Sequence, residues 1–173
     1  MRRRTGPRRS AGTGLLRSGG IDAVQFREYR AGDLEAIFAL DQVCFANPFQ
    51  FSRRAMRQFA EARNALTVVA EDEATAQIAG FCIAHVEGRA GYVVTLDVAA
   101  EHRRRGLAGA MMQRIEQQAV AAGCDTMELH VFVENDAAIA FYEREGYERA
   151  QVVRAFYGPH RNAYLYRKTP IKI

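Results

Sequence analysis

A basic loop with two glycines is the segment whose residue types point most directly to chemistry. An apolar stretch ending Thr95-Leu-Asp-Val98 is followed by the run Arg-Arg-Arg-Gly-Leu-Ala-Gly at 103–109. Gly106 and Gly109 allow a ligand to approach the backbone closely. A helix beginning here would direct unpaired N–H groups and the positive end of its dipole at an anion. The loop could therefore hold a diphosphate, or it could be a capped helix with a solvated basic turn.

The surrounding sequence predicts the elements that would position this loop. Apolar runs bounded by turn residues predict strands, and apolar residues at helical spacing predict helices. The expected strands cover 24–30, 65–70, 78–86, 92–98, 126–133, 151–156 and 162–167, and the expected later helices cover 106–122 and 136–145. With two helices between the first two strands, the order is β-α-α-β-β-β-α-β-α-β-β. This order predicts an α/β fold, a mixed sheet with helices on both faces.

Cap residues and a crossover complete this prediction. Asp33 and Ser52 are expected to cap the first two helices, and Gly123 and Gly146 to end the later two. The first helix is expected to bury one face, formed by Leu34, Ile37, Phe38 and Val43. The helix from Gly106 should join two parallel neighbouring strands by a right-handed crossover, and a ligand site is expected outside the carboxyl ends of such strands.

Two motifs in this framework resemble those of the GNAT superfamily of N-acetyltransferases. The first is Arg-x-x-Gly-x-Ala at 103–108, after a strand ending Leu-Asp-Val. The second is Asn135-Asp-Ala-Ala-Ile-Ala-Phe-Tyr142-Glu-Arg-Glu-Gly-Tyr147, similar to the family pattern Asn-x-x-Ala-x-x-x-Tyr-x-x-x-Gly-Phe. The resemblance covers roughly residues 24–168. Together with Cys44-Phe-Ala-Asn-Pro-Phe, the second motif looks most like RimI-type enzymes, which acetylate protein N-termini.

The resemblance implies a GNAT fold with a splayed central strand pair and acetyl-CoA as cosubstrate. The strands at 92–98 and 126–133 would separate, and the pantetheine arm would pair with the backbone of the first. An N–H group of that strand would also stabilise the oxyanion, a contact commonly worth about 2.7–4 kcal/mol. Asn135 would bind the CoA arm, cap its helix, or do both. The implied cofactor-binding residues are Leu96, Asp97, Val98, Arg103, Arg104, Arg105, Gly106, Leu107, Ala108, Gly109 and Asn135.

The resemblance also implies a general acid. Tyr142 matches the tyrosine that protonates the leaving thiolate in this family. It lies seven positions after Asn135, about two helical turns, so both side chains can face the cofactor. The alternative is a tyrosine of the hydrophobic core.

The general base departs from the RimI-type pattern. Those enzymes carry a glutamate five residues before the motif asparagine, and this chain has His130 there. Glu128 should point to the same face of the strand, and Asp97 is a third candidate with an equally plausible structural role. A neutral imidazole suits an α-amine, with a pKa near 7.7–8.0, better than a lysine with a pKa near 10.4. His130 could instead only shape the cleft.

Four functions are compatible with these residues. The first is acetylation of a protein N-terminal α-amine, which predicts an open groove between the loop at 47–52 and the hairpin at 156–164. The second is acetylation of a small amine, such as an amino acid, a polyamine or a drug, which predicts a closed pocket. Asn162 stands where RimI-type proteins commonly have an acid, and this weakens the first. The others are a CoA-binding or sensory domain without turnover, and RNA binding by a basic tail.

Composition bounds the remaining possibilities. Residues 1–20 contain six arginines and no acid, and the rest of the chain has 18 basic against 20 acidic residues. We expect residues 1–20 to be a disordered tail (with a transit peptide, an RNA-binding arm or an over-extended gene start as alternatives) and 21–173 to be a single domain. Nucleic-acid contacts are expected only from the tail. We expect a cytoplasmic monomer or homodimer with reduced cysteines, no metal and no membrane span.

Overall fold

The computed structural model describes residues 23–172 and has the element order expected from the sequence. Its strands are β1 (Val24–Arg27), β2 (Ala65–Asp72), β3 (Ile78–Glu87), β4 (Ala90–Val98), β5 (Thr126–Phe132), β6 (Glu148–Val153) and β7 (Ala163–Lys168). Its α-helices are α1 (Leu34–Cys44), α2 (Arg53–Ala60), α3 (Leu107–Ala121) and α4 (Asp136–Arg144). The predicted tail at 1–20 lies outside the described residues.

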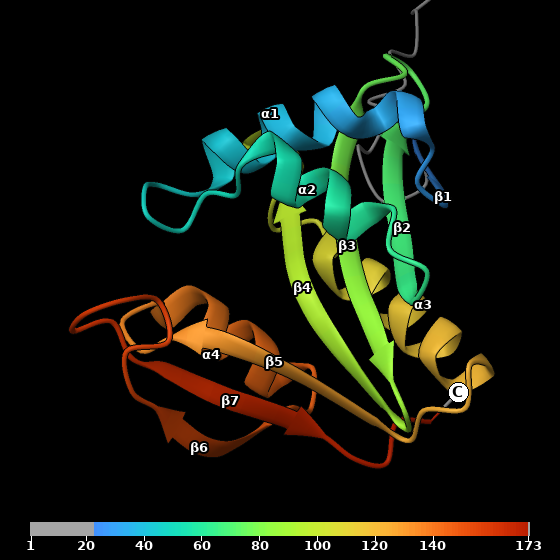
Figure 1. The fold of residues 1–173 in the computed structure, drawn as a ribbon. Helices are drawn as coiled ribbons and strands as arrows, with labels where there is room; N and C mark the ends of the chain where they lie inside the picture. The colour runs from blue at the N-terminus through green and yellow to red at the C-terminus, as the bar shows by residue number, and fades with distance from the viewer. Residues whose placement is uncertain (1–22, 173) are drawn as a thin grey trace, which may run out of the picture.

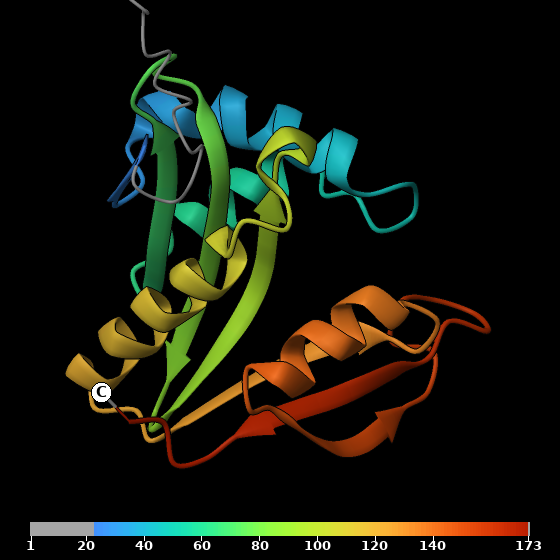
Figure 2. The ribbon, with the colours of Figure 1, turned by 180° about the vertical axis from the view of Figure 1, so that it is seen from behind.

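The strands form one mixed sheet in the order β1-β2-β3-β4-β5-β7-β6. Helices α1 and α2 cover one face of β1–β4, and α3 covers the other; α4 lies against β5–β7 on the same side as α3 (Figures 1 and 2). One hydrophobic cluster lies beneath α1 and α2, and a larger one lies beneath α3 and α4. The predicted mixed sheet with helices on both faces is confirmed.

The central strands β4 and β5 are parallel neighbours only at one end. They pair at Ala90–Thr126, Gly91–Met127 and Tyr92–Glu128, and then diverge, so that the two halves of the molecule form a wedge (Figure 1). Gly91 permits the close approach at the joint, because a Cβ atom there would collide with the sulfur of Met127. Beyond Tyr92, the edge of β4 that faces β5 has no strand partner among residues 23–172.

A bulge in β4 determines which side chains face the slot. Ile83 of β3 pairs with Thr95, but the next residue, Ala84, pairs with Val93, so Val94 is the extra residue. Val93 packs in the cluster beneath α3, and Val94 packs in the cluster beneath α1 and α2. After the bulge, Leu96 and Val98 pack on the α3 side. Thr95 and Asp97 consequently face the side covered by α1.

Helix ends agree with the sequence at three of four positions. The Ser52 hydroxyl accepts a hydrogen bond from the Ala55 N–H at 3.2 Å, and Gly123 and Gly146 have φ angles of 91° and 87° just after their helices. Asp33 does precede α1, but its carboxylate makes no hydrogen bond to the helix N-terminus. That carboxylate instead accepts hydrogen bonds from the Arg27 guanidinium at 2.7 and 2.9 Å.

Two local predictions are wrong. Val43 is 77% exposed, because the inward stripe of α1 contains Leu34, Ile37 and Asp41, and Val43 lies about 200° around the helix from Asp41. The strand expected at 151–156 is β6, which begins at Glu148, after a short turn that follows α4, and pairs with β7 up to Val153. The segment 154–162 is therefore a loop between β6 and β7.

The three cysteines are free thiols, buried at Cys82 and Cys124 and half-buried at Cys44. Within residues 23–172, no helix is long and apolar enough to cross a membrane. The described residues also contain no group of three or more His, Cys, Asp and Glu side chains positioned to hold a metal.

Candidate active site

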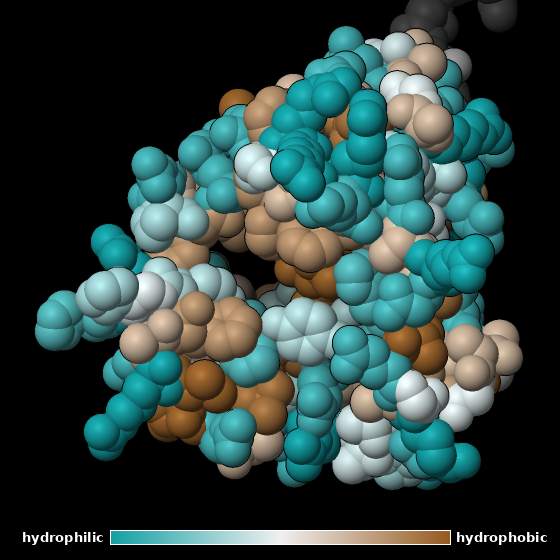
Figure 3. Space-filling model, viewed as in Figure 1, coloured by the Kyte–Doolittle hydropathy of each residue, from teal (hydrophilic) through white to brown (hydrophobic). Residues whose placement is uncertain are grey.

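A cavity of about 400 Å³ occupies the fork between β4 and β5. The surface is visibly hollowed between the part of the molecule under α1 and α2 and the part formed by β5–β7 (Figure 3). Residues from the α1–α2 loop, β4, β5, α4 and the β6–β7 loop line the cavity; they include Phe49, Thr95, Asp97, Asn135, Tyr142 and Tyr157. The cavity therefore lies where β4 and β5 are no longer joined by backbone hydrogen bonds.

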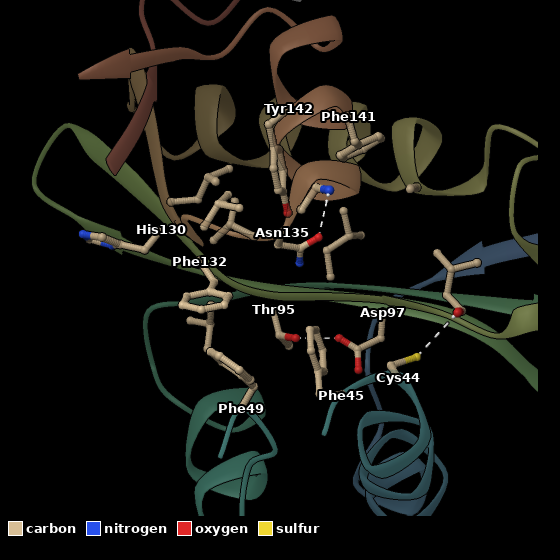
Figure 4. Close-up of a pocket in the computed structure, with 18 of the residues that line it drawn as sticks. Cys44, Phe45, Phe49, Thr95, Asp97, His130, Phe132, Asn135, Phe141 and Tyr142 are labelled. Carbon is tan, nitrogen blue, oxygen red and sulfur yellow. Dashed lines mark hydrogen bonds between the residues drawn. The ribbon is translucent and has the colours of Figure 1, made fainter. Parts of the chain in front are cut away.

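Tyr142 and Asn135 face this cavity from α4 (Figure 4). The Asn135 side chain accepts a hydrogen bond from the Ala138 N–H at 3.1 Å, which confirms the helix-cap interpretation. Tyr142 is 9% exposed, and its ring makes edge contacts with Phe141 and Tyr147. Burial raises the pKa of its hydroxyl well above the usual value, so the group keeps its proton at neutral pH.

The loop at 103–109 leads into α3 near the cavity. Gly106 caps the helix with a φ of 82°, a left-handed conformation that favours glycine, and Arg104 has a φ of 58°. Arg104 and Arg105 are exposed, and Leu107 is buried, so Leu107 offers a ligand only its backbone. The first turn of α3 presents N–H groups that the helix leaves unpaired.

Arg103 and Gly109 have structural roles that the sequence did not suggest. The Arg103 guanidinium donates to the Val98 carbonyl at 2.9 Å and contacts the Cys44 sulfur at 3.5 Å, so it joins the loop to the ends of β4 and α1. A Cβ atom at Gly109 would lie 3.2 Å from the Glu145 carboxylate. The close approach at Gly109 is thus to the end of α4.

Of the three candidate bases, His130 lines the same cavity as Tyr142 but turns its ring away from that residue, and Glu128 lies outside the cavity. His130 Nδ1 lies 3.0 Å from the Tyr92 hydroxyl, and the imidazole is directed away from Tyr142 and Asn135 (Figure 4). Burial lowers the pKa of His130, so its ring is neutral at pH 7. Glu128 has the expected strand phase, but it accepts hydrogen bonds from Arg167 at 2.6–2.7 Å and does not line the cavity.

Two buried carboxylates lie on the opposite side of the slot from Tyr142. Asp97 is 1% exposed; its Oδ1 accepts a hydrogen bond from the Thr95 hydroxyl at 2.5 Å, and its Oδ2 has no partner within residues 23–172. Asp41 of α1 is fully buried, and its Oδ1 likewise has none there. Burial raises the pKa of Asp97 to about 7, and the Asp41 charge adds to the shift. Sequence reasoning missed Asp41, although an aspartate on the apolar stripe of α1 was a usable signal.

An aromatic contact narrows the cavity on its outer side. The Phe49 ring in the α1–α2 loop lies 5.1 Å from the rings of both Phe132 and Tyr157. The Tyr157 hydroxyl donates to the His130 carbonyl at 3.1 Å. The two loops expected to flank an open peptide groove therefore contact each other through Phe49 and Tyr157.

Comparison with known proteins identifies the family of this chain. The model of the acetyltransferase (GNAT) family matches residues 34–147, which include both motifs. The chain belongs to the GNAT family. It is thus an acetyltransferase by family, and GNAT enzymes use acetyl-CoA as the acetyl donor.

Solved structures share this GNAT fold. The ribosomal-protein-S18-alanine N-acetyltransferase from Escherichia coli is 23% identical, with a TM-score of 0.75 over 87% of this chain and 95% of that one. NAA60 from Arabidopsis thaliana, in complex with acetyl-CoA, is 22% identical, with a TM-score of 0.75 over 84% and 98%. The spermidine/spermine N-acetyltransferase from Vibrio cholerae is 18% identical, with a TM-score of 0.68 over 87% and 94%. These matches include enzymes named for protein and for small-molecule substrates, and at such identities they support the fold alone.

Proposed function

We propose that this protein is a cytoplasmic N-acetyltransferase that moves the acetyl group of acetyl-CoA to a protein N-terminal α-amine. The observation that carries the proposal is the slot between β4 and β5. The N-terminus of α3 lies near this slot, and the Tyr142 hydroxyl is directed into it. These parts match the needs of a thioester with a long diphosphate-containing arm.

In this proposal the cofactor lies along the unpaired edge of β4. The diphosphate would bind the amides of the 104–109 turn, where the α3 dipole and the exposed Arg104 and Arg105 favour negative charge. The pantetheine arm would pair with the backbone of 96–98, taking the place of the missing strand. Asn135 would reach the arm with its amide N–H₂ group, because its oxygen caps α4.

The chemistry is direct transfer without a covalent enzyme intermediate. The neutral amine nitrogen attacks the thioester carbon, and the carbonyl electrons move to oxygen, where a β4 N–H group stabilises the oxyanion. When that intermediate collapses, the C–S bond breaks and Tyr142 gives its proton to the sulfur. The nitrogen loses one proton before attack and one afterwards, and the products are the amide and CoA thiol.

The opening of the cavity at the surface supports an α-amine. The hollow opens at the surface between α1–α2 and β5–β7, so a chain terminus can enter (Figure 3). The structural neighbours include NAA60 and an enzyme whose name gives the alanine of ribosomal protein S18 as its substrate. A small amine is the second candidate, and the contact between Phe49 and Tyr157 favours it, because that contact closes part of the rim.

Calorimetric titration of acetyl-CoA into the full chain tests the cofactor part of the proposal. We expect binding, and its loss in an Arg104→Glu/Gly106→Glu double variant, with Arg54→Glu as an exposed matched control that retains it. Thiol release would then be compared for a peptide beginning with alanine and for spermidine. Failure of the folded chain to bind acetyl-CoA would refute the proposal. Preference for spermidine would assign the small-amine function.

A further inference from the structure

We propose that Asp97 is the group that binds the incoming amine and takes its proton before attack. The inference rests on the proposed N-acetyltransferase function and deepens it. It starts from an unpartnered oxygen: Asp97 is 1% exposed, lines the active-site cavity, and leaves Oδ2 without a hydrogen bond within the described part of the chain. A buried carboxylate oxygen without a partner is costly, and an ammonium group is the ligand that would satisfy it.

The direction of approach agrees with this role. Tyr142 enters the slot from α4, whereas Thr95 and Asp97 lie on the side of α1, where Phe45 and Phe49 also line the cavity (Figure 4). An amine that reaches the thioester from the α1 side would contact Asp97 first. Tyr142 would then act on the thioester from the opposite, α4 side of the slot. The Thr95 hydroxyl fixes Asp97 Oδ1 at 2.5 Å, which leaves Oδ2 for the substrate.

The surroundings adjust the proton affinity of Asp97. Burial raises its pKa and the Thr95 hydrogen bond lowers it; the Asp41 charge then raises it and Arg103 lowers it, with a result of about 7. A carboxylate with a pKa near the working pH is a better base than an ordinary aspartate. The titratable groups close enough to interact electrostatically with Asp97 are Asp41 and Cys44 on α1, Cys82 on β3, Arg103 in the loop and Tyr142 on α4.

The proton balance is simple. An ammonium substrate gives one proton to Asp97 Oδ2, the neutral amine then forms the C–N bond to give the oxyanion intermediate, and the C–S bond breaks when that intermediate collapses. Tyr142 protonates the sulfur and is restored by the second proton that the nitrogen releases, and Asp97 returns its proton to solvent. His130 lies at the outer side of the cavity, with Nδ1 engaged by Tyr92, and this sequence does not require it.

The test compares four full-length proteins: wild type, Asp97→Asn, His130→Ala and the matched control Asp125→Asn, whose partly exposed carboxylate pairs with Arg89 away from the cavity. Each is titrated with acetyl-CoA, assayed for thiol release with a peptide beginning with alanine, and titrated with the same peptide as its CoA complex. We expect Asp97→Asn to bind acetyl-CoA normally and to lose about 100-fold or more in kcat. His130→Ala should lose less, and Asp125→Asn should match wild type.

A fifth protein tests whether Asp97 is the group whose titration controls kcat. Asp41→Asn removes a charge that raises the pKa of Asp97, so the rise of kcat with pH should move to lower pH relative to wild type. A larger loss for His130→Ala than for Asp97→Asn would overturn the assignment, as would an unmoved pH profile in Asp41→Asn. Failure of the wild-type CoA complex to bind the peptide, or of the wild-type enzyme to acetylate it with acetyl-CoA, would also overturn it. Acetyl-CoA binding in that experiment would leave the cofactor part of the proposed function intact.

Discussion

Replacing Tyr142 with phenylalanine should separate catalysis from stability. The Tyr142 ring packs against Phe141 and Tyr147 at centroid distances of 4.9 and 5.7 Å, and phenylalanine keeps these contacts. The hydroxyl has no hydrogen-bond partner within residues 23–172, so its removal leaves no buried group unsatisfied. We therefore expect the free energy of unfolding to change by less than about 1 kcal/mol.

The effect on turnover should be much larger. Without Tyr142 the thiolate must leave unprotonated or take its proton from water, and general acid catalysis commonly contributes about 10²–10⁴-fold. A 100-fold loss corresponds to about 2.7 kcal/mol of transition-state stabilisation. We expect kcat to fall by that factor or more while the Kd for acetyl-CoA stays near the wild-type value.

The assay is thiol release with an alanine-terminated peptide, alongside urea unfolding followed by circular dichroism. Tyr147→Phe is an informative comparison, because the Tyr147 hydroxyl donates to the buried Glu116 at 2.9 Å. That variant should lose stability and keep its turnover. If Tyr142→Phe retained full kcat, the acid assignment would be wrong, and a CoA-binding domain without this chemistry would regain support.

Two further predictions concern the framework. Gly91→Ala should destabilise the protein by about 1–3 kcal/mol in urea unfolding, because its methyl group would meet the Met127 sulfur where β4 and β5 join; an unchanged midpoint would show that the joint can spread. The second of these predictions concerns Asp33. Burial raises the pKa of this carboxyl group, but hydrogen bonds from Arg27 and Arg30 outweigh burial and hold the pKa below its usual value. Asp33 should thus stabilise the fold above its unfolded-state pKa and lose that contribution as pH falls through the folded-state pKa. The unfolding midpoints of wild type and Asp33→Asn should differ at pH 7 and converge in acid, and a constant gap would contradict the linkage.

The sequence predicted the elements because they leave local signals. Apolar runs with β-hairpin turns located the strands, and Gly123 and Gly146 marked helix ends at which only a left-handed residue fits easily. The errors arose where tertiary structure overrides local pattern. Val43 is apolar but lies on the outer face of α1, because the inward position belongs to the acidic Asp41.

The candidate site was only partly predictable for a similar reason. Tyr142 and Asn135 lie on one helix seven residues apart, so helical geometry alone brings them to the same cavity. The contact between Phe49 and Tyr157 joins loops more than one hundred positions apart, and no periodicity encodes it. The distance between Tyr142 and His130 depends on the direction in which one imidazole turns, toward Tyr92 in this case.

The bulge at Val94 links these observations into one account of the site. In a regular strand, side chains alternate strictly, so Asp97 would share a face with Val93, toward α3 and the cofactor loop. The extra residue reverses the phase, placing Leu96 and Val98 on that apolar side and turning Asp97 toward α1. A carboxylate on the cofactor side would repel the diphosphate, whereas on the α1 side it can meet a cationic amine. In the proposed reaction, this one inserted residue in β4 would thus separate the site of the anionic donor from the site of the cationic acceptor across the same slot.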